Sequence, residues 1–513
     1  MERKKGVILS YVLMIFEVLS TLFLTPFLLR TLGQAEFGVY KLSASITAYL
    51  LLLDLGVGNA IIKFVSKFRI CKDVEAEHKF VAVGICFYGA IAAIALIAGM
   101  VLVSLFPTMF RKGLSSEEIL LGQKLLVLTV INAAITIGTT LFHNILIAYE
   151  RFDISKGVSI LQIIIRILLT VFALKVGYGS LGVVSVNLMM TILTRSFFAF
   201  YVVKKLKVKP CFHGISRGFV KEIFAYSGLI LIQMVATQIN ASLDQILLGA
   251  FVASSATIIT VYSIGTQVVQ YFQSIGSAFS GVLMPGVVRM VERQSSSDAI
   301  RAEMVRIGRM VLMVLGIIWG VFLIFGRQFI FLWAGKENSE AFFVAILLMT
   351  AYLFILSESI GTQILWAKNE HKEQSVLKLT IVFVNIVLTI MLIKWNPLLG
   401  ATIGTFLSLL MGDIVVMNVI FAKKLHISMK RYYKELFRGI WLCILIAVIS
   451  GWGIDRIPLT GWIGLGIKIL VMCLVYVVSL FMIGMNSGEK KLIYSLLRIK
   501  EKEGVSEKND NRE

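Results

Sequence analysis

The sequence lacks most of the residue patterns that bind metals, cofactors or phosphate in enzymes. Its five cysteines form no CxxC pair and its five histidines show no metal-ligand spacing, so we expect no metal site. It has no GxxxxGK[ST] loop, which excludes a built-in ATPase of that type. The run GYGSLG at 177–182 matches GxGxxG, but no strand precedes it, so we interpret it as a turn. We therefore expect a protein that is not an enzyme and that has no cofactor.

Apolar residues dominate the composition. The chain of 513 residues is 58% hydrophobic, with a mean hydropathy of +0.87, and a soluble globular protein does not bury that much apolar surface. Apolar runs of about twenty residues, the length that crosses a bilayer, recur along the chain. The runs are continuous rather than alternating, which favours helices over barrel strands. The predicted fold class is an all-α polytopic membrane protein with about 14 transmembrane helices.

The apolar runs also give the approximate positions of the spans. The loops between them are short, which is evidence against a membrane glycosyltransferase or polymerase with an active site in a long loop. The first run follows MERKKG, contains Glu17 and precedes no A-x-A site, so we expect a retained helix rather than a signal peptide. The predicted spans are 7–29, 40–62, 80–106, 124–148, 157–176, 181–203, 223–250, 256–284, 307–333, 341–366, 376–395, 398–422, 438–454 and 462–484.

Positive charge is distributed in a way that indicates membrane orientation. The chain has 50 basic and 30 acidic residues, for a formal net charge of +20. With the N-terminus in the cytoplasm, most basic residues fall in cytoplasmic loops, and shifting the helices by one span reverses this bias. We therefore expect both termini in the cytoplasm and no nucleic-acid partner. The tail from about Gly488, rich in lysine and glutamate, is expected to be solvated.

Short matches relate the two halves of the chain. The triplet KKL at 204–206 recurs at 423–425, and ILIA at 145–148 has its counterpart in ILWA at 364–367. Each half holds an even number of spans, so the repeat is parallel, with a pseudo-two-fold axis along the membrane normal, as in secondary transporters. The predicted domains are a six-helix lobe at 1–210 followed by a basic linker, a second six-helix lobe at 220–430, helices 13 and 14 at 431–487, and a cytoplasmic tail at 488–513.

Charged residues inside the spans are candidates for function, because each costs about 2.5–3.5 kcal/mol at mid-helix. Glu17 and Arg166 lie near the middle of the first and fifth spans and form either a structural ion pair or part of a substrate site. Asp54 lies roughly 14 Å along the second span from Lys63, near mid-membrane. Gly56 and Gly58 allow a bend there, so they are the predicted hinge, and Asp54 marks either a kink or a functional site.

Polar side chains follow the seventh and eighth spans. Gln233, Asn240 and Asp244 recur at helical spacing on the seventh, and Gln270 lies among the amides of the eighth. Such a stripe either bonds membrane helices to one another or lines a wet cavity. Amides are good hydrogen-bond partners for sugar hydroxyls. The stripe therefore favours a cavity that binds a glycan.

Two motifs lie close together near the start of the chain, LG-x-x-x-FG-x-Y at 32–40 and DLG-x-G-x-A-x-x-K at 54–63. They resemble the signature of the polysaccharide flippase family, which includes the O-antigen flippases. That family belongs to the multidrug/oligosaccharidyl-lipid/polysaccharide exporter superfamily, and its fourteen-helix, two-lobe layout is similar as well. The resemblance implies a multi-pass protein of the bacterial inner membrane. It would move a lipid-linked oligosaccharide, carried on a polyprenyl diphosphate, to the outer leaflet.

The resemblance also implies where the substrate binds. Helices 1, 2, 7 and 8 of such proteins line a central cavity, and in the related lipid II flippases that cavity carries arginines for the diphosphate. This sequence departs from that pattern, because its first two spans carry Glu17 and Asp54 at mid-membrane. A capsule, teichuronic or exopolysaccharide-type unit is therefore favoured over lipid II. The basic candidates are Arg30, Lys41, Arg166 and Arg195.

Transport by alternating access of two lobes is the leading functional hypothesis. The expected partners are the lipid-linked glycan, the bilayer and a glycan polymerase or other export machinery. An H⁺ or Na⁺ gradient is the expected source of coupling, with Glu17 and Asp54 as the groups that would titrate. The alternative is a multidrug or organic-cation antiporter of the same superfamily.

Overall fold

The computed structural model describes residues 2–54, 56–212, 235, 238–239, 242–292, 296–368, 370 and 372–496. Every regular element in these residues is a helix. Nine of the described helices are long and apolar enough to cross a membrane, or eleven if each of two bent helix pairs counts as one span. Leu9–Cys71 counts once but covers the first two predicted spans, and the seventh, 223–250, lies largely outside the described residues. The prediction of an all-α, multi-pass membrane protein is confirmed.

The chain divides into two compact units. The first contains Met1–Ser274, Ile330–Tyr352 and Lys368–Ile420, and the second contains Ile275–Phe329, Leu353–Ala367 and Phe421–Glu513. The division into six-helix lobes at 1–210 and 220–430 stays a prediction.

The first unit begins with a long helix that changes direction at a glycine. Helix α1 (Glu2–Leu51) contains Gly33 with a φ of 74°, a left-handed conformation that glycine adopts without a steric penalty. A single 3₁₀ turn, Leu52–Asp54, follows α1, and helix α2 (Val57–Cys71) begins after Gly56, whose φ is 68°. The second predicted span, 40–62, is therefore interrupted within its apolar run. The interruption coincides with the predicted hinge at Gly56.

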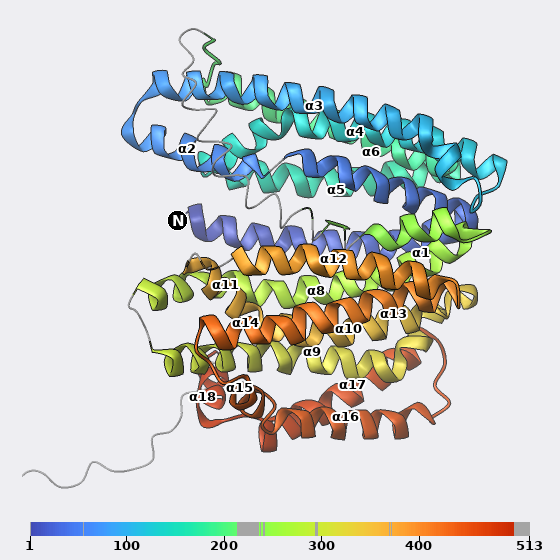
Figure 1. Cartoon of the computed structure of the whole chain (residues 1–513), viewed down its shortest axis with the longest axis vertical. Coiled ribbons are helices and arrows are strands. Elements are labelled where there is room, and N and C mark those ends of the chain that lie inside the picture. Colours follow the sequence, from blue (N-terminus) through green and yellow to red (C-terminus); the bar gives the residue numbers. More distant parts are fainter. Residues whose placement is uncertain are drawn as a thin grey trace, which may run out of the picture. The chain divides into compact units, whose positions relative to one another are not determined.

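The next four helices form the bundle on which the site is built. Figure 1 shows α3 and α4 side by side, and α4 also packs on α6 and α1. Ser115 and Glu118 form a capping box at the start of α4, where the Ser115 amide donates to Glu118 Oε2 at 2.7 Å. Asp73 caps α3 by accepting from the Ala76 amide at 3.0 Å. The four helices are α3 (Val74–Phe110), α4 (Ser116–Ala148), α5 (Phe152–Lys175) and α6 (Gly179–Phe200), which continues as the π-helical turn Tyr201–Lys205.

The remaining helices of the first unit come from the middle of the chain. Helices α12 and α13 pack tightly on each other, because Gly404 on α13 lies directly against Thr389 on α12. A Cβ at Gly404 would lie 2.7 Å from Thr389 Oγ1 and 2.9 Å from its backbone nitrogen. The helices that contribute are Ser242–Phe251, the first part of α8 (Ser255–Glu292), the ends of α9 (Ser297–Ala334) and α10 (Ala341–Ser357) that belong to this unit, α12 (Lys372–Ile393), and α13 (Pro397–Leu409) with the π-helical Leu410–Val416.

Large apolar side chains point outward from the bundle. On α5, Leu161, Ile164, Leu168 and Phe172 recur at three- and four-residue spacing and are 40–66% exposed. This spacing places them on one face of the helix. A contiguous exposed apolar face on a spanning helix is a surface for lipid rather than water.

The second unit is held together around a buried arginine on α9. Arg309 is 5% exposed and forms a bidentate ion pair with Glu489, with an Nε–Oε1 distance of 2.6 Å. It also donates to four backbone carbonyls, including those of Arg438 at 2.8 Å and Gly484 at 2.6 Å. The other helices here are α11 (Ser359–Ala367), the second half of α14 (Met417–Lys424), α15 (Met429–Leu436), the packed pair α16 (Ile440–Asp455) and α17 (Gly461–Ser479), and α18 (Ser487–Leu496).

Candidate functional site

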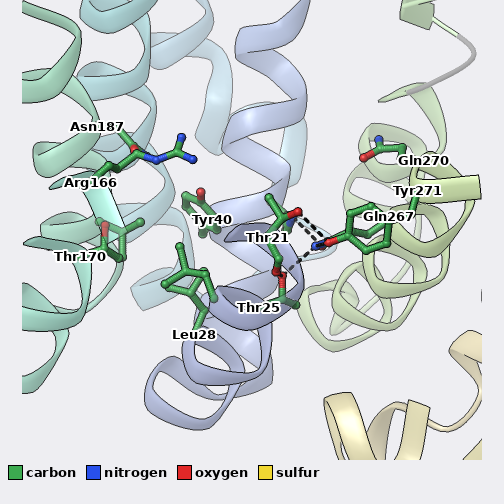
Figure 2. A pocket seen from close by; sticks show the side chains of 13 residues that line it. Thr21, Thr25, Leu28, Tyr40, Arg166, Thr170, Asn187, Gln267, Gln270 and Tyr271 are labelled. Carbon is green, nitrogen blue, oxygen red and sulfur yellow. Dashed lines mark hydrogen bonds between the residues drawn. The ribbon is translucent and has the colours of Figure 1, made fainter. Parts of the chain in front are cut away.

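A polar pocket of about 170 Å³ opens among four helices of the first unit. Both arms of α1 contribute to it, one before and one after the change of direction at Gly33. Figure 2 shows Arg166 extending from α5 toward α1, while Gln267 and Tyr271 reach α1 from α8. The lining residues are Thr21, Leu24, Thr25, Leu28, Tyr40, Lys41, Arg166, Thr170, Val183, Asn187, Gln267, Gln270 and Tyr271.

A continuous hydrogen-bond network runs through this pocket. Lys41 Nζ donates to Gln267 Oε1 at 3.3 Å, and Gln267 Nε2 donates to Thr25 Oγ1 at 2.8 Å and to the Tyr271 hydroxyl at 2.6 Å. Tyr271 donates to Thr21 Oγ1 at 2.9 Å. Amide and hydroxyl groups that bond one another across two helices also present donors and acceptors to a ligand between them. The network therefore forms a polar wall that connects α1 to α8.

The pocket carries positive charge that is not neutralised within the described chain. Lys41 lies over the Phe37 ring at 5.3 Å, and Arg166 lies beside Tyr40. Nε of Arg166 is buried without an acceptor, and no carboxylate lines the pocket in the part of the chain that the structure describes. A buried cation without a partner is unfavourable, so an anionic ligand would stabilise this arrangement.

A second polar cluster in the same unit surrounds Asp244, whose side chain is buried with 2% exposure. Tyr262 on α8 donates a short hydrogen bond to Oδ2, and Thr405 on α13 donates to the same oxygen at 2.5 Å. Thr389 on α12 lies 3.3 Å from Oδ1 and donates to Asn385 Oδ1 at 2.9 Å. No cationic side chain of the described residues pairs with Asp244. One carboxylate, one amide oxygen and three hydroxyls thus gather where four helices meet.

The structure divides the predicted site residues into separate groups. Lys41, Arg166 and Gln270 line the pocket. Glu17 and Arg30 are exposed on α1 and do not line it. Within the described chain no ion pair joins Glu17 to Arg166, so the proposed structural pair does not form.

The other predicted residues lie elsewhere. Asp54 ends the 3₁₀ turn before α2, beside Tyr88 on α3 and Arg195 on α6. Gly58 follows on α2 and packs against Asn144 of α4. Gln233 and Asn240 fall outside the described residues. The site therefore consists of a cationic pocket and, separately, the carboxylate cluster of Asp244.

Several pocket residues were not among those predicted from the sequence. Thr21 and Thr25 lie four residues apart on the first span, a spacing that places them on one helix face and could have flagged them. Asn187 and Tyr271 carry no such signal, because single polar residues in a span are as common in helix packing as in binding. Only the packing of α6 and α8 against α1 identifies them.

The chain is similar to known membrane proteins along most of its length. The family described as "Polysaccharide biosynthesis protein" matches residues 3–291. An uncharacterized membrane protein of Bacillus subtilis (strain 168), EpsK, is 20% identical over 509 residues, which cover 94% of this chain and 96% of that protein.

Solved structures show the same fold at low sequence identity. The lipid II flippase MurJ, in an inward closed conformation, is 17% identical, with a TM-score of 0.72 over 96% of this chain and 99% of that one. An inward-facing multidrug resistance transporter of the MATE family, in the MOP superfamily, is 12% identical, with a TM-score of 0.62 over 80% of this chain and 96% of that one. The resemblance to the exporter superfamily is thereby confirmed at the level of the fold.

Proposed function

Because this chain belongs to the polysaccharide biosynthesis protein family, we propose that it is a flippase for a lipid-linked glycan. The proposed substrate is an oligosaccharide of the capsule or exopolysaccharide kind on a polyprenyl diphosphate, moved from the inner to the outer leaflet. The observation that carries this proposal is the pocket, where two cations without carboxylate partners lie beside a row of hydroxyl and amide groups. The cations suit the diphosphate, and the row suits the sugar attached to it.

The cationic part of the pocket matches the chemistry of a diphosphate. Arg166 presents a planar set of donors that can bond two phosphate oxygens at once, and Lys41 supplies a compact charge. The two residues lie on α5 and on α1, so one diphosphate between them would hold both helices. The lipid chain would remain in the bilayer.

The size of the pocket limits what this conformation can hold. About 170 Å³ is less than the roughly 300–1,000 Å³ of a pocket that encloses a drug-sized ligand. The diphosphate and part of one sugar fill such a space, whereas a complete repeat unit does not. The cycle therefore includes a more open state, which rocking of two lobes would provide.

Coupling to a cation gradient is part of the proposal, with the Asp244 cluster as its site. The donors are a carboxylate, the Asn385 amide oxygen and hydroxyls, which are the oxygen ligands that hard cations prefer. A bound Na⁺ or H⁺ would offset the cost of burying the Asp244 charge. Glu17 and Asp54 stay predictions as coupling groups, and the exposure of Glu17 makes it the weaker of the two.

The alternative function is that of a multidrug or organic-cation antiporter, and the MATE neighbour is named a multidrug resistance transporter. The charge of the pocket argues against it, because Lys41 and Arg166 would repel a cationic drug and no carboxylate lines the pocket in the described chain. A cell-based efflux assay separates the two functions. Extrusion of an organic cation that depends on this chain would favour the antiporter.

The proposed setting is the cytoplasmic membrane of a bacterium, with both termini in the cytoplasm and a glycan polymerase acting on the product. Basic loops alternate with apolar spans in the manner that sets this orientation. The protein acts as a transporter, not an enzyme, since the glycan leaves chemically unchanged. A polymerase would consume the flipped lipid on the outer leaflet.

Deletion followed by analysis of lipid-linked intermediates tests the function. We expect a completed glycan lipid to accumulate on the cytoplasmic leaflet, because assembly continues while transfer stops. Protection of that glycan from an impermeant glycosidase identifies the leaflet, and the accumulated lipid identifies the cargo. Delivery at the normal rate in the deletion strain would rule the proposal out.

A further inference from the structure

Five buried polar side-chain atoms that lack a hydrogen bond of good geometry gather in the bundle of α1 to α6, away from the pocket and from Asp244. They come from the 3₁₀ turn before α2, from α3, from α4 and from α6. They are Asp54 Oδ1, Tyr88 OH, His143 Nδ1, Asn144 Nδ2 and Arg195 Nη1.

These side chains adjoin one another around the interruption in the second span. Asp54 lies beside Tyr88 and Arg195. The Tyr88 hydroxyl is also within hydrogen-bonding reach of Asn144, and His143 lies within electrostatic range of Arg195. They form one cluster, named here the Asp54 cluster.

The start of α2 is part of the same cluster. Gly56, at the N-cap of α2, gives the first turn no side-chain hydrogen bond. Two residues later, a Cβ at Gly58 would lie 2.6 Å from Asn144 Nδ2. The uncapped amides of a helix start therefore lie close to the Asn144 side chain.

Burial makes the missing partners costly. Tyr88 is 0% exposed and Asn144 is 7% exposed. Val57 and Ile61 of α2 belong to the same apolar core as Tyr88. Tyr88 is within hydrogen-bonding reach of Asp54 and Asn144. His143 Nδ1 and Arg195 Nη1 have no such neighbour among the described residues. An unsatisfied buried polar group costs about 1–3 kcal/mol, so a polar occupant among these groups would stabilise them.

The mixture of groups identifies the occupant. The Asp54 carboxylate would repel an anion, and the Arg195 guanidinium would repel a metal cation at the same place. Water donates to Asp54, accepts from Arg195 and Asn144, and can do either with Tyr88. We propose that the Asp54 cluster is a hydrated proton-binding site built into the break of the second span, where Asp54 gains and loses a proton.

The proton step involves only Asp54 and water. A hydronium gives its proton to Asp54 Oδ1, so that one O–H bond breaks, another forms and a neutral water remains. The reverse step returns the proton. The groups that face Asp54 are Tyr88 from α3 and Arg195 from α6, while His143 of α4 lies within electrostatic range of Arg195 and Lys156 of α5.

Protonation changes what holds the break in place. The ionised carboxylate attracts Arg195 and so anchors the turn before Gly56 to α6. A neutral carboxyl loses that attraction, which frees α2 to turn about Gly56, whose left-handed φ marks the flexible point. The proton site thus regulates the transport proposed above. Only this regulatory effect, not the binding of the proton, rests on the proposed flippase function.

Infrared difference spectroscopy of the full-length protein in nanodiscs tests the proton site without any substrate. Lowering the pH should produce bands of protonated carboxyl groups, and Asp54→Asn should remove one component of them, that of Asp54. Asp413→Asn is the control, because Asp413 is also a carboxylate within the helices but is buried and ion-paired with Lys378, and it should keep the Asp54 component. Carboxyl bands that are unchanged in Asp54→Asn would overturn the proposal.

Hydrogen exchange of the α2 amides tests the link to the helix break. After correction for the chemical effect of pH, exchange at Val57–Ala60 should rise as Asp54 is protonated and should become independent of pH in Asp54→Asn. Tyr88→Phe keeps the carboxyl but removes the hydroxyl beside it, so it should move the midpoint of the pH dependence while keeping the dependence itself. It serves as the second variant if Asp54→Asn folds poorly. If this exchange does not change with pH in the unaltered protein, protonation of Asp54 is not coupled to the helix break.

The outcomes separate this site from the function of the protein. A carboxyl band that depends on Asp54 in a protein that flips no glycan lipid would leave the proton site standing and refute the flippase. Flipping of the glycan lipid without such a band would refute the proton site and leave the flippase function standing. Neither measurement requires the glycan to be identified.

Discussion

Two polar clusters of the first unit have opposite charge although the same helix contributes to both. The pocket holds Lys41 and Arg166 without a lining carboxylate, and the second cluster holds buried Asp244 without a cationic partner, among the described residues. If these charges served stability alone, pairing them would remove two costs at once. Their separation supports the proposal that each binds a mobile ion, an anion in the pocket and a cation at Asp244.

Helix α8 provides a physical connection between the two clusters. Tyr262 bonds Asp244, and Gln267, about 7.5 Å further along the helix, bonds Lys41 and Thr25. A cation at Asp244 would change the bonding of Tyr262 and hence the position of α8 against α1. Coupling between two such sites is typically about 1–3 kcal/mol and acts in both directions.

The largest expected effect is that of Asp244→Asn, which removes the charge from the cation cluster. The amide keeps the shape but no longer attracts a cation, so gradient-driven flipping in proteoliposomes should be lost. Thermal unfolding provides a substrate-free readout, because a cation at 100 times its dissociation constant stabilises by about 2.7 kcal/mol. This stabilisation should disappear in the variant.

Asp413→Asn is the control for that experiment. It removes a buried carboxylate that is ion-paired with Lys378, so it should lower the melting temperature while keeping the shift with the cation. Separate Na⁺ and pH series identify the ion. If Asp244→Asn keeps the full cation shift in both series, the cluster is structural.

The next-largest effect concerns the cationic pocket, which is proposed to bind the diphosphate. Arg166→Gln and Lys41→Gln should each weaken binding of a polyprenyl diphosphate by about 1.5–3 kcal/mol, the contribution of a charged hydrogen bond. That is about 10- to 100-fold in the dissociation constant. Fluorescence quenching or native mass spectrometry with the diphosphate lipid measures it.

Arg30→Gln is the matched control, because Arg30 is a basic residue of α1 that is exposed and does not line the pocket. It should bind the lipid normally. Equal losses in all three variants would mean that the charge of the protein as a whole, not the pocket, attracts the lipid.

The sequence predicted the helices better than the site, for a physical reason. Lipid fixes the length and apolarity of a span, so the apolar runs alone located α3 to α6 to within several residues. The interruption at Leu52–Asp54 lies inside one such run, and only Gly56 and Gly58 indicated it.

The site depends on contacts between distant parts of the chain. Asp244 could be suspected because a charge in a span is costly, but its partners Thr389 and Thr405 lie 145 and 161 residues away. Arg166 was suspected for the same reason. Arg166 lies near Lys41 rather than Glu17 because α1 changes direction at Gly33, and no residue pattern specifies that turn.

Packing between α12 and α13 gives a smaller test of the cation cluster. In Gly404→Ala the new methyl would approach the Thr389 backbone to 2.9 Å, so the two helices must separate. Overpacking of this kind costs about 1–3 kcal/mol, which thermal unfolding measures, and the cation shift should weaken with it. Gly89→Ala on α3 is the control, because a Cβ there meets nothing within 4 Å.

The smallest effect distinguishes the wall of the pocket from its charge. Tyr271→Phe removes the hydroxyl that joins Gln267 to Thr21 and leaves Lys41 and Arg166 in place. Affinity for the complete glycan lipid should fall by about 0.5–1.5 kcal/mol, the net worth of a neutral hydrogen bond. Affinity for the bare diphosphate lipid should stay unchanged, because that ligand has no sugar for the wall to bind. If both affinities fall equally, the Tyr271 hydroxyl positions Lys41 through Gln267, and the polar wall does not bind the sugar.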